Sequence, residues 1–402
     1  MRLALPRLAL PIFVAICCFM LCSSLGASCA VEGFVLLDGA AGAGGTGGGG
    51  SVGGSAGAAG GICGHVQAPP PPATSDAGND VEIVLAMRDF DIGETALENG
   101  PLVGYDLDAL CSCRGDGPSC NPPPYAEADT CDGPSGRDNA AAGLWEASSV
   151  FVPELASTAM TAEITAGHFT LLMRIRNYNG QPNDERVEVA FFASPGRDND
   201  PCLTVPPAPP TWNGNDSWPV ASTSLTPNMG AGGGCSAPGF DLEAPRYIDP
   251  DAYVTGGTLV ATLDDLAFLI RNEDTLAEIH LKVASITGRL EQAASGWLLE
   301  EGVVAGRWPV EELRLAFVAL AANGVSLCSD SPLYENLRNA VCNYPDIASA
   351  LSGPTTPCDA VSFGLSFAAA PALLGSIWEH VTPPSMCAPG TDPAADSCES
   401  RL

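Results

Sequence analysis

Acidic and cysteine residues crowd one stretch of the sequence. Asp106 and Asp108 stand near its start in "YDLDALCSC", and Asp132, Asp138 and Asn139 follow in "CDGPSGRDN". Calcium takes six to eight oxygen ligands, mostly from carboxylates, amides and backbone carbonyls. Four cysteines lie between the two acidic groups, and disulfides there would hold such oxygens together. The spacing therefore predicts a calcium site formed by Asp106, Asp108, Asp132, Asp138 and Asn139.

An alternative interpretation needs no metal. Asp, Asn and Gly are the ordinary residues of turns. The stretch also lacks the EF-hand pattern, because no loop-closing Glu follows Asp108 at the required spacing. Disulfide-linked turns explain the same composition, and they are the favoured interpretation. The tripeptide 114–116, Arg-Gly-Asp, is likewise interpreted as part of a turn.

Residues for catalysis are not recognisable in the sequence. Neither a G-x-S-x-G nor an H-E-x-x-H motif is present, and the four histidines stand alone, so they are interpreted as structural. Two carboxylates for glycoside hydrolysis can be far apart in sequence, but nothing singles out a pair among 47 acidic residues. Trp212 and Trp218 in "TWNGNDSW" could stack on a sugar, or pack back on the domain as a lid. The lid is the favoured interpretation.

Charge and cysteine content restrict the compartment and the partners. The formal net charge is −30, which repels phosphate backbones and argues against nucleic acid as a partner. Twelve cysteines follow Cys29, an even number that predicts disulfides in an exported protein. We expect one bridge between Cys202 and Cys235 and another between Cys328 and Cys342.

The N-terminal region is typical of an exported protein. Residues 1–28 read as a signal peptide, with two arginines, an apolar core over 8–21 and small residues after it. Within "LGASC", Cys29 is the expected site of lipidation, although Gly26 replaces the usual aliphatic residue. Simple cleavage after Ala27 or Ala30 is the alternative. Residues 29–79, rich in Gly, Ala and Pro, are expected to form a flexible tether.

The remaining residues, 80–402, are expected to form a Cys-rich β domain. Alternation with a period of two recurs in "TLLMRIRN", "RVEVAFFAS" and "AVSFGLSFAAA", between segments rich in Gly, Pro and Asn. This pattern predicts an antiparallel β-sandwich, jelly-roll-like, with a few short helices. Helices are expected in 308–324 and 331–345, where Pro309 and Pro332 stand near the helix starts.

Several of these segments together resemble a known group of proteins. "GYDLDALCSC", "YNGQPNDERVEVAFFASPG", "GVVAGRW" and "CDAVSFGLSF" are similar to motifs of myxobacterial-type secreted Cys-rich lipoproteins of unknown function. The resemblance implies export and a Gly-rich tether behind a lipidated cysteine, but no activity and no catalytic residues.

We therefore expect an outer-membrane lipoprotein or a secreted protein, anchored to the membrane by lipid. Its domain is expected to act as a binding or structural module, with a carbohydrate or a protein as ligand. A secreted polysaccharide hydrolase that uses unidentified carboxylates is the alternative, and a purely structural envelope protein is the third interpretation.

Overall fold

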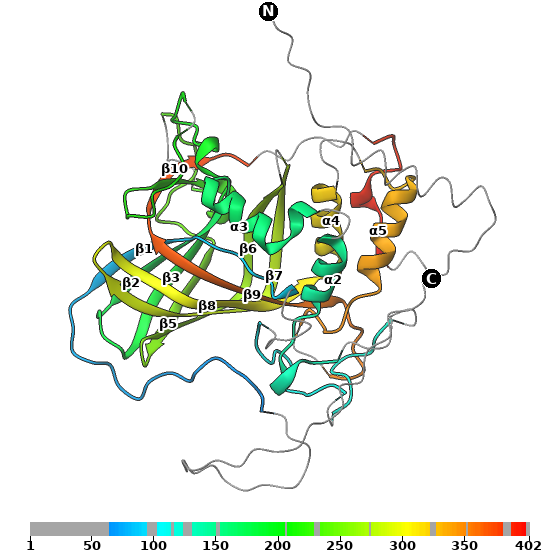
Figure 1. Cartoon of the computed structure of the whole chain (residues 1–402), viewed down its shortest axis with the longest axis horizontal. Coiled ribbons are helices and arrows are strands. Elements are labelled where there is room, and N and C mark those ends of the chain that lie inside the picture. The colour runs from blue at the N-terminus through cyan, green and yellow to red at the C-terminus, as the bar shows by residue number, and fades with distance from the viewer. Residues whose placement is uncertain are drawn as a thin grey trace, which may run out of the picture. The chain divides into compact units, whose positions relative to one another are not determined.

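Eight antiparallel strands form a closed barrel in the computed structural model of the protein (Figure 1). The structure describes residues 64–94, 103–113, 116–123, 131–149, 153–205, 207–228, 234–272, 275–321, 327–350, 353–380 and 387–398. The signal peptide, Cys29 and the tether up to residue 63 lie outside these ranges. In spatial order the strands are β1 (Val81–Met87), β2 (Thr170–Tyr178), β3 (Asp184–Ser194), β5 (Tyr247–Thr255), β6 (Thr258–Asn272), β7 (Thr275–Ala293), β8 (Gly296–Pro309) and β9 (Ala360–Pro371).

The barrel closes because β1 pairs with β2 on one side and with β9 on the other. A second sheet, formed by β4 (Ser217–Ala221) and β10 (Leu373–Trp378), covers part of the outer surface. Trp218, Val220 and Ile377 of this small sheet pack with Leu172 and Phe192 of the barrel. The prediction of a mainly antiparallel β fold with layered sheets is thus confirmed, and the strand order adds that the larger sheet closes on itself.

The described part of the chain contains four α-helices: α2 (Ala140–Ser149), α3 (Ser157–Ala166), α4 (Val310–Ala321) and α5 (Pro332–Cys342). Short 3-10 helices span Pro134–Gly136, Pro153–Leu155, Arg197–Asn199, Ser222–Ser224 and Pro393–Ala395. The two predicted helices, α4 and α5, are confirmed. Ser331 caps α5 as its hydroxyl accepts the backbone N–H of Tyr334 at 3.1 Å, and Pro332 begins the helix. Among the described residues, no helix is long and apolar enough to cross a membrane.

Side chains fill the barrel and continue into the helices at one end of it. Alternate residues of the strands supply most of this core, and α2 and α4 add Trp145 and Phe317, whose rings meet edge to face at 5.6 Å. Figure 1 shows α2, α4 and α5 together at this end. The core therefore joins the barrel and the helices into one packed unit.

Residues 64–76, which we call the strap, lie against the barrel although their composition predicted part of a flexible tether. The Tyr253 hydroxyl donates to the Pro69 carbonyl at 2.7 Å. The backbone N–H of Asp76 donates to the carbonyl of Asn183, in the turn between β2 and β3, at 2.9 Å. Prolines lack an N–H but keep their carbonyl acceptors, so a proline-rich segment can still be fixed by hydrogen bonds. The folded unit thus begins before residue 80.

Five disulfides cross-link the described residues, and Cys111 is also disulfide-bonded. The five join Cys113 to Cys131, Cys120 to Cys358, Cys202 to Cys235, Cys328 to Cys387, and Cys342 to Cys398. The expected Cys202–Cys235 bridge is confirmed. So many disulfides form only in an oxidising compartment, which makes the protein extracytoplasmic.

The expected Cys328–Cys342 bridge is wrong. Cys342 ends the eleven-residue helix α5 and Cys328 precedes its start, so the two are separated by a helix about 16 Å long. A disulfide requires Cα atoms within about 7 Å. Each cysteine instead bonds the C-terminal segment 387–398, which both bridges hold against α4 and α5.

This pairing can be checked by peptide mapping of the oxidised protein. Trypsin combined with an endoprotease that cleaves before aspartate separates all four cysteines, because Arg338, Asp346, Asp359 and Asp392 stand between them. We expect the peptide of Cys328 linked to that of Cys387 and the peptide of Cys342 linked to that of Cys398. A Cys328–Cys342 species as the main product would contradict the structure.

Candidate metal centre

The acidic stretch forms a compact set of turns between β1 and α2. We call its described residues, 103–113, 116–123 and 131–139, the loop unit. Apart from one 3-10 turn it has no regular helix or strand longer than a single bridge. The Cys113–Cys131 disulfide closes it internally, and the Cys120–Cys358 disulfide ties it to the segment before β9. Covalent bonds therefore replace the hydrophobic core that so short a segment cannot form.

Three of the predicted ligands converge within the loop unit. One oxygen from each of Asp106, Asp108 and Asp138 lies within 4.8 Å of the others. Each carboxylate also accepts a backbone N–H from residues 107–110, at 2.7, 2.9 and 2.6 Å respectively. These bonds fix the orientation of all three side chains. We call these three residues the aspartate cluster.

Asp132 lies next to the aspartate cluster and adds to its negative charge. It accepts the backbone N–H of Ser112 at 2.6 Å, and burial raises its pKa to about 6. Burial, together with the charges of Asp108 and Asp132, raises the pKa of Asp138 to about 10. Without a cation, the four adjacent carboxylates cannot all remain ionised, and their repulsion favours a proton within the group.

A buried guanidinium offsets part of this charge. Arg307 of β8 is 2% exposed and donates to three backbone carbonyls: Leu107 at 2.6 Å, Ala348 at 2.7 Å and Ala350 at 3.1 Å. Burial lowers its pKa, while nearby aspartates, with Asp108 the largest contributor, act in the opposite direction. Arg307 thus holds two loops on the barrel and places a positive charge beside the carboxylates.

Asn139 has a different role from the one predicted. Its Nδ2 donates to the carbonyls of Ile92 and Gly364, and its Oδ1 accepts the N–H of Gly364 at 2.9 Å. The amide is thus hydrogen-bonded to β9 and to Ile92, which follows β1, rather than to the aspartate cluster. A Cβ at Gly364 would lie 2.4 Å from the Val103 carbonyl, so this glycine lets the loop unit approach β9 closely. The structure thus uses the Asn139 amide in contacts with β9 and does not bring it together with the aspartate cluster.

Two residues near the cluster were not predicted to take part in it. His65, in the strap, contacts Asp106 through Nδ1 at 2.5 Å from Oδ2. Gly136 has a φ of +73°, and a Cβ there would lie 3.0 Å from the Asp106 carboxylate and 3.1 Å from the Leu110 carbonyl. A larger residue would fill the space between these oxygens. The sequence signal was the "DGPSG" turn, whose glycines permit positive φ.

The donor set fits a hard cation better than a transition metal. All three members of the aspartate cluster are carboxylates, and no thiolate takes part because every described cysteine is in a disulfide. Calcium favours such oxygen ligands and tolerates irregular geometry, whereas zinc prefers nitrogen and sulfur. Three carboxylates would also supply charge close to that of Ca²⁺. The residues present therefore fit calcium, with water completing the coordination.

Trp212 and Trp218 pack back on the domain, as the lid interpretation predicted. Trp218 is 0% exposed, and its ring centroid lies 5.6 Å from that of Trp212. Trp212 packs against the barrel core and against the apolar residues between the barrel and the small sheet. The Asp216 carboxylate accepts the backbone N–H groups of Thr211 and Trp212 at 2.9 and 2.6 Å and so folds the loop over the barrel. A fully buried Trp218 has no face for a sugar.

No family model, no curated protein and no solved structure matches the chain. The resemblance of its motifs to myxobacterial-type lipoproteins stays a prediction.

A second charged cluster joins α4 to the barrel, and its centre is His280 of β7. The imidazole Nε2 lies 2.6 Å from Asp265 of β6, and Nδ1 contacts Glu312 in the first turn of α4. Lys282 is 3.1 Å from the same Asp265. Burial raises the pKa of nearby Glu278, and the His280 charge acts in the opposite direction. Hydrogen bonds to Asp265 and Glu312 raise the pKa of His280 to about 9. His280 is therefore charged at neutral pH and has a structural role.

This cluster predicts a pH-dependent contribution to stability. The folded pKa of His280 is raised from its ordinary value of 6.5, so its contribution is fully present below pH 6.5 and is lost as pH rises through about 9. We expect His280→Gln to lower the free energy of unfolding at pH 6, and this deficit to vanish near pH 10. Denaturant unfolding of both proteins at several pH values measures the difference. A deficit that stays constant with pH would exclude the ionic role.

Proposed function

We propose that the protein is an extracytoplasmic binding module whose aspartate cluster binds calcium, and that Cys29 tethers it to the outer membrane by lipid. The convergence of Asp106, Asp108 and Asp138 within 4.8 Å carries the proposal. Each side chain is held by a backbone N–H, so the entropy cost of gathering the ligands is met during folding.

Charge balance supports a bound cation. Asp106, Asp108, Asp132 and Asp138 lie together, with the Arg307 guanidinium beside them and the His65 imidazole hydrogen-bonded to Asp106. A proton within the group relieves the repulsion only in part. A divalent ion would neutralise two charges at once and could contact all three carboxylates of the aspartate cluster.

A polysaccharide hydrolase is less well supported. Glycosidases need two carboxyl groups of different pKa that flank a substrate cleft. Asp132 and Asp138 differ in pKa, but both are buried and accept backbone N–H bonds inside the loop unit. Because both carboxyl groups are buried and already accept backbone N–H bonds, the pair is unsuited to reach a glycosidic bond.

Removal of the carboxylates should abolish stabilisation by calcium. A ligand at about 100 times its Kd adds about 2.7 kcal/mol to stability, which raises the Tm of a domain of this size by about 5 °C. We expect this rise on adding calcium to the chelator-treated, oxidised protein, and no rise for the Asp108→Asn, Asp138→Asn double variant. Thermal melts in calcium and in excess chelator measure the effect.

The matched control is Asp330→Asn, which removes one negative charge at an exposed position. It should keep the full calcium response, since it lies outside the aspartate cluster. Equal melting temperatures of the parent protein in calcium and in chelator would refute the calcium site. An equal response in the double variant would place the binding elsewhere.

The tether is tested separately. Cys29→Ser removes the only thiol of "LGASC" that can be acylated, so the protein should lose incorporated fatty acid and move from the membrane to the soluble extracytoplasmic fraction. Mass spectrometry of the N-terminal peptide and membrane fractionation measure both. A parent protein without acylation, starting after Ala27 or Ala30, would refute lipid anchoring and leave the calcium site unaffected.

A further inference from the structure

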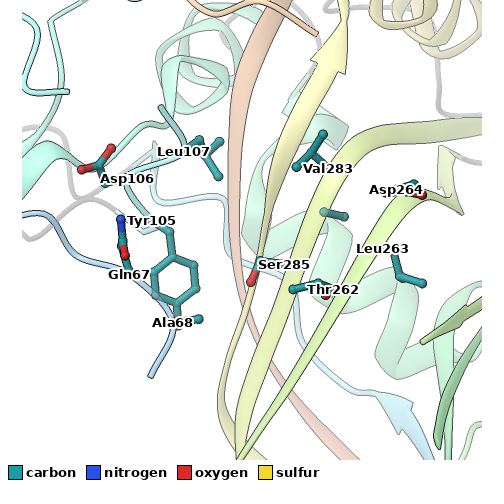
Figure 2. Close-up of a pocket in the computed structure, with 11 residues that line it drawn as sticks. Gln67, Ala68, Tyr105, Asp106, Leu107, Thr262, Leu263, Asp264, Val283 and Ser285 are labelled. Atoms are coloured by element: carbon teal, nitrogen blue, oxygen red, sulfur yellow. The ribbon is translucent and has the colours of Figure 1, made fainter. Parts of the chain in front are cut away.

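A groove of about 250 Å³ lies between the loop unit, the strap and the outer surface of β6 and β7 (Figure 2). Tyr105 and Leu107 of the loop unit form one side with Gln67 of the strap. Thr262, Asp264, Val283 and Ser285 form the floor. The Asp106 carboxylate, fully buried, points away from the groove in Figure 2, so the groove and the aspartate cluster lie on opposite sides of one backbone segment.

At the floor of the groove, the alternation of inward and outward side chains is interrupted in both β6 and β7. Core-facing residues in β6 step from Leu263 to Leu266, and those in β7 step from Leu281 to Ala284, so each strand contains one extra residue. Leu263 pairs with Ala284 and Asp265 pairs with Lys282, so Asp264 of β6 and Val283 of β7 lie between these two pairs. Against β8, the register of β7 shifts between Lys282 and Ser285, as in a β-bulge. Bulges redirect side chains and are common beside binding sites.

Val283 adopts a backbone conformation that is unusual for its type. Its φ is +49°, in the left-handed region, where a β-branched side chain is strained by about 1–3 kcal/mol. A glycine would allow the same bulge without this strain. With valine at this position, the strained backbone directs an apolar side chain into the groove, and Val283 is 38% exposed.

The charged side chains that line the groove are acidic. Asp264 is exposed and forms no ion pair with any described residue, and no Lys, Arg or His is among the described residues lining the groove. Tyr105 and Leu107 on one side and Val283 on the floor supply the aromatic and apolar surface of the groove. The volume is below the range of about 300–1,000 Å³ that is typical of sites for drug-sized ligands.

From this geometry we infer that the groove binds an aliphatic chain ending in an ammonium or guanidinium group. The aliphatic part lies against Leu107 and Val283, and the cationic end pairs with Asp264. The Tyr105 ring can add a cation–π contact. A basic side chain of a polypeptide and a free diamine share this chemistry, and both are attracted by a protein with a net charge of −30.

Ligand-observed NMR titrations of the oxidised full chain test this inference, at one fixed calcium concentration. The probes are N-acetyl-lysine amide, cadaverine and the uncharged N-acetyl-norleucine amide. We expect one or both amines to bind more tightly than the norleucine derivative. Tighter binding of the lysine derivative indicates a polypeptide side chain, and tighter binding of cadaverine indicates a free diamine. Amines that bind no better than N-acetyl-norleucine amide would overturn the inference.

Two variants locate the binding. Asp264→Asn should weaken amine binding about fivefold, the upper range for a partly exposed ion pair, and Asp330→Asn should leave it unchanged. Val283→Gly should weaken binding of all three probes without lowering Tm, because glycine accepts the positive φ. Unchanged amine affinity in Asp264→Asn would also overturn the inference. Since Asp264 lies outside the aspartate cluster, its variant should keep the calcium response, and this separates the two proposals.

Discussion

Repulsion among crowded carboxylates is the constraint on which the candidate site depends. Asp106, Asp108 and Asp138 lie within 4.8 Å of one another, and Asp132 adds a fourth charge. Left to itself, such a segment would open so that each carboxylate could be hydrated. Disulfides and backbone N–H bonds prevent this, so the negative charge must be offset locally. The Arg307 guanidinium of β8 offsets part of this charge. The carboxylate oxygens of the aspartate cluster fit calcium as the cation that offsets the rest.

The closed barrel supplies the surface against which the loop unit is held. Arg307 of β8 and Ser362 of β9 are register partners, so their side chains lie on the same face. Ser362 accepts the backbone N–H of Ala140 at 2.8 Å and bonds Asp346, whose pKa is raised to about 7 by burial. A polar, buried patch on two neighbouring strands thus fixes both ends of the acidic segment and the 346–350 loop. The opposite side of the same segment forms a wall of the groove.

Local patterns in the sequence predicted much of this structure, whereas long-range contacts could not be predicted. Period-two alternation identified the long strands, and prolines with Ser331 identified α4 and α5, because these signals lie within each element. Helices α2 and α3 were missed, since "AAAGLWEASS" and "STAMTAEITA" have little contrast between apolar and polar faces. The aspartates of the cluster were recognised from their types and spacing. His65, Arg307 and the partners of Cys328 and Cys342 were not, because each depends on a segment distant in sequence.

The most direct test of the calcium site is a crystal structure of the oxidised Cys29→Ser protein grown with calcium, with anomalous diffraction measured at long wavelength. The account predicts an anomalous peak between Asp106, Asp108 and Asp138, with oxygen atoms at about 2.3–2.6 Å from it. Crystals soaked in chelator should lose the peak. A map from saturating calcium with no peak at the aspartate cluster would contradict the account and leave protons and Arg307 as the means by which these charges are offset.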